Sequence, residues 1–211
     1  LAHASLAGVA MGLLVRENPI VSAFFVTSFF GVSIEILRQR FRRYAELILV
    51  IILSLSVGIA ITIISSGAVH ANVESFLFGS ILTVSREDVW SVVILSVASI
   101  VTVWKLYPQL VLLTFDEEGA VIAGVHSKWI NYIFSILVAA TISVSIRIGV
   151  ILVISSLIAL PVATALQLGQ GFRTTMGAAV VVSFIDIISG LTVSYWLNTA
   201  PGGMTAIISV L

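Results

Sequence analysis

Long apolar runs separated by short polar turns set the pattern of this chain. A run near 20 residues is needed to cross a bilayer core of about 30 Å. Six runs approach or exceed that length, at residues 20–37, 44–65, 88–106, 129–146, 150–168 and 174–197. Their polar positions lack the period of two that strands show, and in hydrocarbon the backbone must be hydrogen-bonded internally. The runs therefore predict membrane-spanning helices.

Two shorter apolar runs, residues 1–15 and 203–211, lie at the ends of the chain. The first starts in mid-pattern with Leu1 and lacks the features of a signal peptide. We interpret both runs as partial spans of a longer protein, truncated at each end. The prediction is an all-α, polytopic membrane helix bundle in which residues 1–211 form a single transmembrane domain.

Composition supports an integral membrane protein. The chain has 59% hydrophobic and 9% charged residues, with a mean hydropathy of +1.19. A soluble domain carries about a quarter of charged residues. Ten basic and ten acidic residues balance, so we expect no nucleic-acid partner. Cysteine is absent from the sequence, which excludes disulfides and thiolate metal sites within it.

Arginines predict the orientation. The turn at residues 38–43 holds four of them, so we place it in the cytosol. Glu35, one turn inside, is spaced to pair with Arg38. The 11 uncharged residues between Glu74 and Arg86 are too few to span, which predicts a re-entrant or interfacial turn on the outer side. The loop at 107–128 then returns to the cytosol; if the short run crossed instead, that loop would lie outside.

Residues 114–125, TFDEEGAVIAGV, hold the densest acidic patch. Three successive carboxylates at 116–118 favour a helix N-terminus, because they complement the positive end of the helix dipole. Thr114 is the candidate N-cap, and Gly124 suits the C-terminal end. This predicts a helix of about two turns between two membrane spans. With little core of its own to fill, it is suited to lie on a partner protein.

Asp186 lies near the midpoint of the run 174–197, where a charge costs at least about 2.5–3.5 kcal/mol. One interpretation is a carboxyl group tied into a helix–helix interface, and the other is a direct role in an ion path. We favour the first and keep both. Helical spacing gives Asp186 a face shared with four small residues, Ser183, Ser189, Gly190 and Ser194.

His3, in the first apolar run, is the other candidate metal ligand, because imidazole binds transition metals. A single histidine does not decide between a ligand and a structural side chain. The sequence contains no phosphate-binding GxxxxGK[ST] motif, so any ATP hydrolysis belongs to another chain. It contains neither HExxH nor GxSxG, and we expect a transport subunit rather than an enzyme.

Five stretches, in order, resemble the membrane-spanning permease subunit of bacterial ABC importers for zinc and manganese. They are LAHASLAGVAMG (1–12), SFLFGSILTVSRED (75–88), FDEEGAVIAGV (115–125), IRIGVILVISSLIALPVATALQL (146–168) and GLTVSYWL (190–197) before PGG. In that family the third stretch corresponds to the coupling helix, which docks in a groove of the ATP-hydrolysing subunit. The resemblance thereby assigns a coupling role to Phe115, Asp116, Glu117, Glu118, Gly119 and Gly124.

The resemblance also assigns His3 a role as a metal ligand. Family members carry an Asp four residues before the corresponding His, and the two hold the metal between them. That position would precede Leu1 here. The resemblance implies a transport complex with two copies of the permease in the cytoplasmic membrane, two cytosolic ATP-binding subunits and an extracellular metal-binding protein. Alternating access would move Zn²⁺ or Mn²⁺ as cargo, with no permanently bound cofactor.

Two other functions stay open at this point. Permeases for metal chelates such as siderophores, haem or cobalamin have a related architecture but need a wider, less ionic path. An ion-coupled secondary transporter would instead use Asp186 as its proton or cation site and would need no ATPase.

Overall fold

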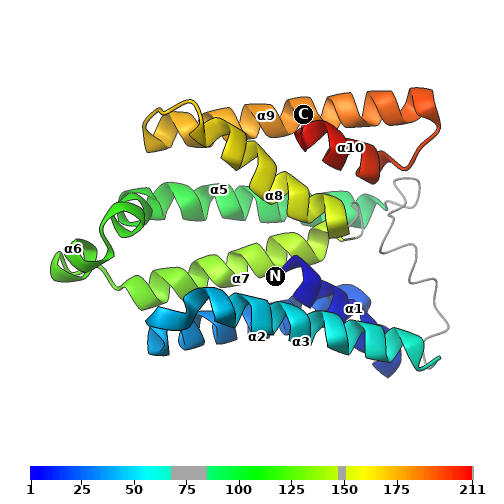
Figure 1. Cartoon of the computed structure of the whole chain (residues 1–211), viewed down its shortest axis with the longest axis horizontal. Coiled ribbons are helices and arrows are strands. Elements are labelled where there is room, and N and C mark those ends of the chain that lie inside the picture. The colour runs from blue at the N-terminus through cyan, green and yellow to red at the C-terminus, as the bar shows by residue number, and fades with distance from the viewer. Residues whose placement is uncertain (68–84, 147–150, 211) are drawn as a thin grey trace. The chain divides into compact units, whose positions relative to one another are not determined.

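The computed structural model describes residues 1–67, 85–146 and 151–210, and every regular element in these ranges is a helix. Two compact units are present (Figure 1). The short run predicted as a re-entrant turn falls at 75–85 and, except for Ser85, lies outside the described residues. That the whole chain forms one transmembrane domain stays a prediction.

Unit 1 contains α1 (Ala2–Val15), α2 (Pro19–Arg40), the 3-10 turn η1 (Arg42–Tyr44), α3 (Ala45–Ser65), α5 (Arg86–Phe115), α6 (Glu117–Ile122) and α7 (Ser127–Ser145). Unit 2 contains α8 (Ile151–Leu166), α9 (Phe172–Leu197) and α10 (Pro201–Val210).

Five described helices are long and apolar enough to cross a membrane: α2, η1 with α3, α5, α7 and α9. They coincide with five of the six predicted spans, and the all-α membrane class is confirmed. The sixth, predicted at 150–168, corresponds to α8. This helix has 16 residues, about 24 Å at 1.5 Å per residue, and is shorter than the other five.

Local sequence explains where α2 begins and ends. The Asn18 side chain accepts a hydrogen bond from the backbone N–H of Ile20 (3.0 Å), and Pro19 occupies the first helical position. Arg38 and Arg40 lie in the last turn, where they complement the negative end of the helix dipole. The apolar span thus ends in the arginine turn.

Small residues let α1 and α2 approach closely. A Cβ atom at Gly8 would lie 2.5 Å from Ala23 Cα, and one at Gly12 would lie 2.9 Å from Pro19 Cα. Close backbone approach through small residues is how helices associate in membranes. Phe30 of α2 and Ile52 of α3 pack with α1 in the buried core of unit 1.

Unit 2 is built around α9, which packs against both α8 and α10. Asn198 adopts a left-handed conformation (φ 50°) and ends α9, after which the chain turns back at Pro201. Gly190 is the point of close approach, because a Cβ atom there would lie 2.5 Å from Thr205 Cα. Exposed large apolar side chains on these helices, such as Phe184, suit a lipid environment.

Candidate functional site

The acidic helix predicted from the sequence is α6, and its N-cap is Asp116. The backbone N–H of Gly119 donates to Asp116 Oδ1 (2.8 Å). A Cβ atom at position 119 would collide with the Asp116 carboxylate as it is placed here, so a larger residue at this position would require the carboxylate to shift. The prediction that Thr114 caps the helix is wrong. Thr114 belongs to α5, and its hydroxyl donates to the carbonyl of Leu110 (2.7 Å).

The loop around α6 is shorter than predicted because α5 continues to Phe115, with Pro108 inside the helix. Residues 107–115, which we placed in the coupling loop at 107–128, are therefore helical. A proline removes one backbone hydrogen bond and crowds the carbonyl four residues earlier, but membrane helices tolerate it where neighbouring groups satisfy the freed carbonyl. The loop proper is reduced to α6 and its flanking residues.

Gly124 ends α6 as predicted. Its φ of 83° lies in the left-handed region, and its N–H donates to the carbonyl of Val121 (3.0 Å). The N–H of Val125 donates to the carbonyl of Ala120 (2.9 Å). These two bonds form a Schellman motif, which favours glycine at this position. With six residues, α6 has fewer than the two turns predicted.

The surface of α6 combines charge with exposed apolar side chains. Ala120 is fully buried, whereas Ile122 is 87% exposed and Phe115, just before the helix, is 72% exposed. The carboxylates of Glu117 and Glu118 are also exposed. Val121 is also 54% exposed, and several exposed apolar side chains on so short a segment favour a surface that a partner covers.

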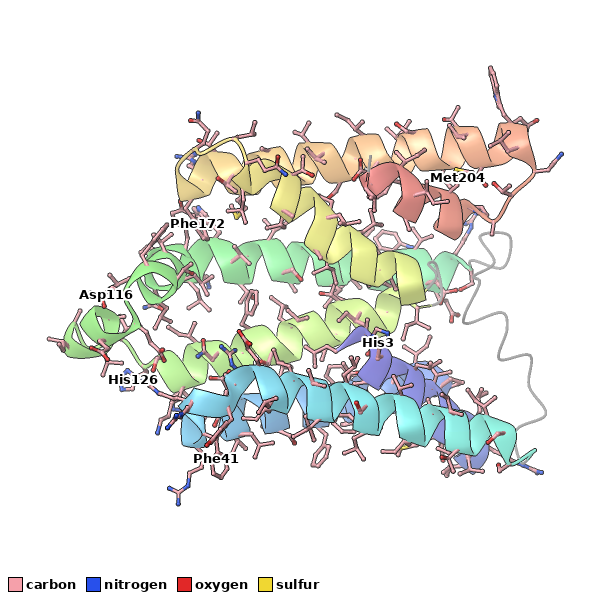
Figure 2. The ribbon with its side chains drawn as sticks, viewed as in Figure 1. His3, Phe41, Asp116, His126, Phe172 and Met204 are labelled. Atoms are coloured by element: carbon pink, nitrogen blue, oxygen red, sulfur yellow. The ribbon has the colours of Figure 1, made fainter. Side chains whose placement is uncertain are left out.

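The arginine turn and α6 lie at the same end of unit 1. Arg42 Nη2 is 3.7 Å from Glu117 Oε1. Figure 2 shows the labelled Phe41, Asp116 and His126 toward this end, and His3 away from it. The topology in which the short run at 75–85 crosses the membrane would put α6 and the arginine turn on opposite sides. The ion pair shows that α6 and the arginine turn lie at the same end of unit 1, as the predicted topology requires of the described helices.

A polar cavity of about 470 Å³ opens between these elements. Glu35 is buried against it, and its Oε1 accepts hydrogen bonds from Gln39 Nε2 (2.8 Å) and Asn131 Nδ2 (2.9 Å). Among the residues that the structure describes, Arg42–Glu117 is the only ion pair, so the predicted pairing of Glu35 with Arg38 is not formed. The cavity is lined by Glu35, Arg38, Gln39, Arg42, Ala45, Leu113, Glu117, Asn131, Phe134 and Ser135.

His3 lies on α1, in unit 1, where it is half-buried. It lines a mostly apolar cavity of about 260 Å³ together with Ile34, Ile52 and Ser56. Within the described parts of the chain, no three His, Asp or Glu side chains gather closely enough to hold a metal ion. The assignment of His3 as a metal ligand stays a prediction.

Asp186 lies on α9, in unit 2, and is 7% exposed. Gly190 and Ser194 are buried on the same face as predicted, whereas Ser183 and Ser189 are half-buried. The Asp186 carboxyl group is thus buried, and one of its oxygens, Oδ2, has no hydrogen-bond partner among the described residues.

Comparison with known proteins decides the family. The model of the ABC 3 transport family matches residues 1–211, the full length of this chain. The chain belongs to the ABC 3 transport family. The resemblance to permease subunits of metal ABC importers is thereby confirmed, and the chain is a multi-pass membrane transport subunit rather than an enzyme. An ion-coupled secondary transporter is not supported.

Relatives of this family member carry names from metal transport. A "Probable metal transport system membrane protein" of Treponema pallidum is 51% identical over 100% of this chain and 79% of its own length. The zinc uptake membrane protein ZnuB of Haemophilus influenzae is 28% identical over 99% of this chain and 80% of its own length. The chelated iron transport protein YfeC of Yersinia pestis is also 28% identical, over 100% of this chain and 72% of its own length.

One solved structure has the same fold. PsaBC from Streptococcus pneumoniae, in complex with Fab, superposes with a TM-score of 0.82 over 99% of this chain and 76% of that chain. The sequence identity is 20%, so this likeness concerns the fold alone. It confirms the predicted ABC-importer permease architecture.

Proposed function

We propose that this permease carries a bare divalent transition metal ion, Zn²⁺ or Mn²⁺, by alternating access. Two copies would work with two cytosolic ATP-binding subunits and an extracellular metal-binding protein. The observation that carries the proposal is α6, a capped helix with exposed carboxylates and an exposed isoleucine beside the arginine turn. Positive charge marks that end as cytosolic, where ATP-binding subunits lie.

The geometry supports transmission of movement from α6 to the membrane helices. Asp116 both ends the 30-residue α5 and caps α6, so the two helices share one residue as their joint. On the other side, Gly124 and its Schellman motif lead directly toward α7. A displacement of α6 by an ATP-binding subunit would therefore move the ends of two membrane helices, as a rigid-body mechanism requires.

His3 and Asp186 are the residues we propose along the ion path. An imidazole is a ligand of borderline softness and suits Zn²⁺ or Mn²⁺ better than an alkali ion. The unpaired Oδ2 of Asp186 offers a hard oxygen ligand. His3 lies in unit 1 and Asp186 in unit 2, and each would need further ligands to hold an ion.

Replacing Ile122 by Asp tests the docking role of α6. The substitution places a charge on a side chain that is 87% exposed, so the fold is retained while an apolar contact with a partner is lost. We expect the ATP-binding subunit no longer to co-purify and metal uptake to fall to background. His126→Asp, at an exposed residue outside α6, serves as the control. Normal co-purification and uptake with Ile122→Asp would contradict the proposal.

A metal chelate is the second candidate cargo, because one relative at 28% identity is named for chelated iron. Uptake by the reconstituted complex distinguishes the two. We expect labelled Zn²⁺ or Mn²⁺ to enter in an ATP-dependent manner and an iron chelate not to compete. Competition by the chelate, with no uptake of the free ions, would establish the alternative.

A further inference from the structure

The cavity at the cytosolic end of unit 1 separates α6 from α2 and α7. Its lining includes Glu117 of α6, Arg42 of η1 and Asn131 of α7, and it is open to the outside. A cavity of about 470 Å³ means that these side chains are not in close-packed contact across it. The position of α6 relative to the arginine turn therefore depends on polar contacts more than on packing.

One such contact crosses the cavity from α6. The Arg42 guanidinium lies 3.7 Å from the Glu117 carboxylate, and both side chains are largely accessible, at 68% and 49%. An accessible ion pair is weak, so it can be broken and re-formed without unfolding either element. Arg43, the next residue of η1, is exposed and does not line the cavity.

A second contact ties the neighbouring helices together. Buried Glu35 of α2 accepts a hydrogen bond from Asn131 of α7, 96 residues later in the chain. Charge-assisted hydrogen bonds of this kind are stronger than neutral ones. The turn that carries Arg42 follows directly on α2, so a force on Arg42 is passed to α2 and, through Glu35, to α7.

We propose that Arg42 is a positioning residue for transport. Its ion pair with Glu117 holds α6 against the turn between α2 and α3 in the state seen here, and the pair opens when the ATP-binding subunits displace α6. This proposal rests on the proposed function of α6 as the coupling helix and adds the residue that sets its resting position. Without the pair, α6 would lose its preferred position, and ATP hydrolysis would depend less on the presence of metal.

Charge reversal in the complete, reconstituted complex tests the proposal. For Arg42→Glu and for Glu117→Arg we expect ATP hydrolysis without metal to rise about two- to fivefold, the effect of losing one accessible ion pair. The ratio of transport to hydrolysis should fall. The double variant Arg42→Glu/Glu117→Arg restores the pair in the opposite sense and should recover most of the metal dependence. Arg43→Glu is the matched control and should behave as the unmodified protein.

Crosslinking provides a readout that a general loss of structure would not reproduce. The sequence has no cysteine, so Arg42→Cys/Glu117→Cys can be joined selectively by a short thiol crosslinker. The joined complex should bind ATP but not transport, and reductive cleavage should restore transport. Equal behaviour of the single reversals and Arg43→Glu, or transport by the joined complex, would overturn the proposal. Failure of the proposed function would instead appear in the unmodified complex, as ATP hydrolysis that does not respond to metal.

Discussion

Asp116 and Gly119 act together at the start of α6. The Asp116 carboxylate accepts the Gly119 N–H and lies so close that a side chain at position 119 would displace it. A helix of six residues is too short to be stable on its own, and most of its order must come from its caps and its tertiary contacts. The two residues therefore contribute to the shape of the proposed docking surface, and not only to its charge.

Replacing Asp116 by Ala should destabilise α6 by about 1 kcal/mol, the usual contribution of an N-cap. Amide hydrogen exchange of residues 117–122 should become faster, while exchange in α5 stays unchanged. Thr114→Val is the control, because the Thr114 hydroxyl bonds to Leu110 within α5. Equal effects of the two substitutions on α6 would contradict the assignment of Asp116 as the cap.

The N-cap of α6 was predicted from the sequence at Thr114 instead of Asp116, and the error has a physical reason. Threonine is a common N-cap, but its hydroxyl also bonds to a carbonyl four residues earlier inside a helix, as Thr114 does here. The choice depends on where the preceding helix ends, and α5 continues beyond the predicted end of its span at residue 106 to Phe115. The C-terminal end was predictable because Gly124 favours a left-handed conformation.

At the scale of elements, one buried bond joins α2 and α7. The Glu35 carboxylate accepts from Gln39 on its own helix and from Asn131 on the other. Helical spacing suggested Arg38 as the partner of Glu35, and no local pattern indicates a residue 96 positions away. Contacts of this kind depend on the tertiary arrangement, whereas apolar runs of span length predict helices directly.

Replacing Asn131 by Leu should destabilise unit 1 by about 1–3 kcal/mol, because a buried carboxylate loses one of its donors. Glu35→Leu/Asn131→Leu removes both polar groups and should be less destabilised than the single variant. Thermal unfolding in detergent measures the difference. A double variant that is less stable than Asn131→Leu would show that the bond does not account for the cost.

At the scale of the whole molecule, the run lengths were sufficient to predict a polytopic helical membrane protein, whereas the prediction of a permease needed the resemblance of five stretches to a known family. The family match and the fold likeness confirm that class. The proposed ion path could not be predicted in this way, because its candidate residues His3 and Asp186 lie in separate units and neither has a ligand cluster among the described residues. Such a site is assembled from several helices, and spacing within one helix does not reveal its other members.

The central claim is that α6 faces the cytosol, where an ATP-binding subunit can reach it. Because the sequence contains no cysteine, Glu118→Cys introduces a single thiol at an exposed position of α6. Labelling with a membrane-impermeant maleimide measures which side of the membrane it occupies. We predict labelling in inside-out membrane vesicles and none in intact cells. Labelling in intact cells would place α6 on the outer surface and contradict the account.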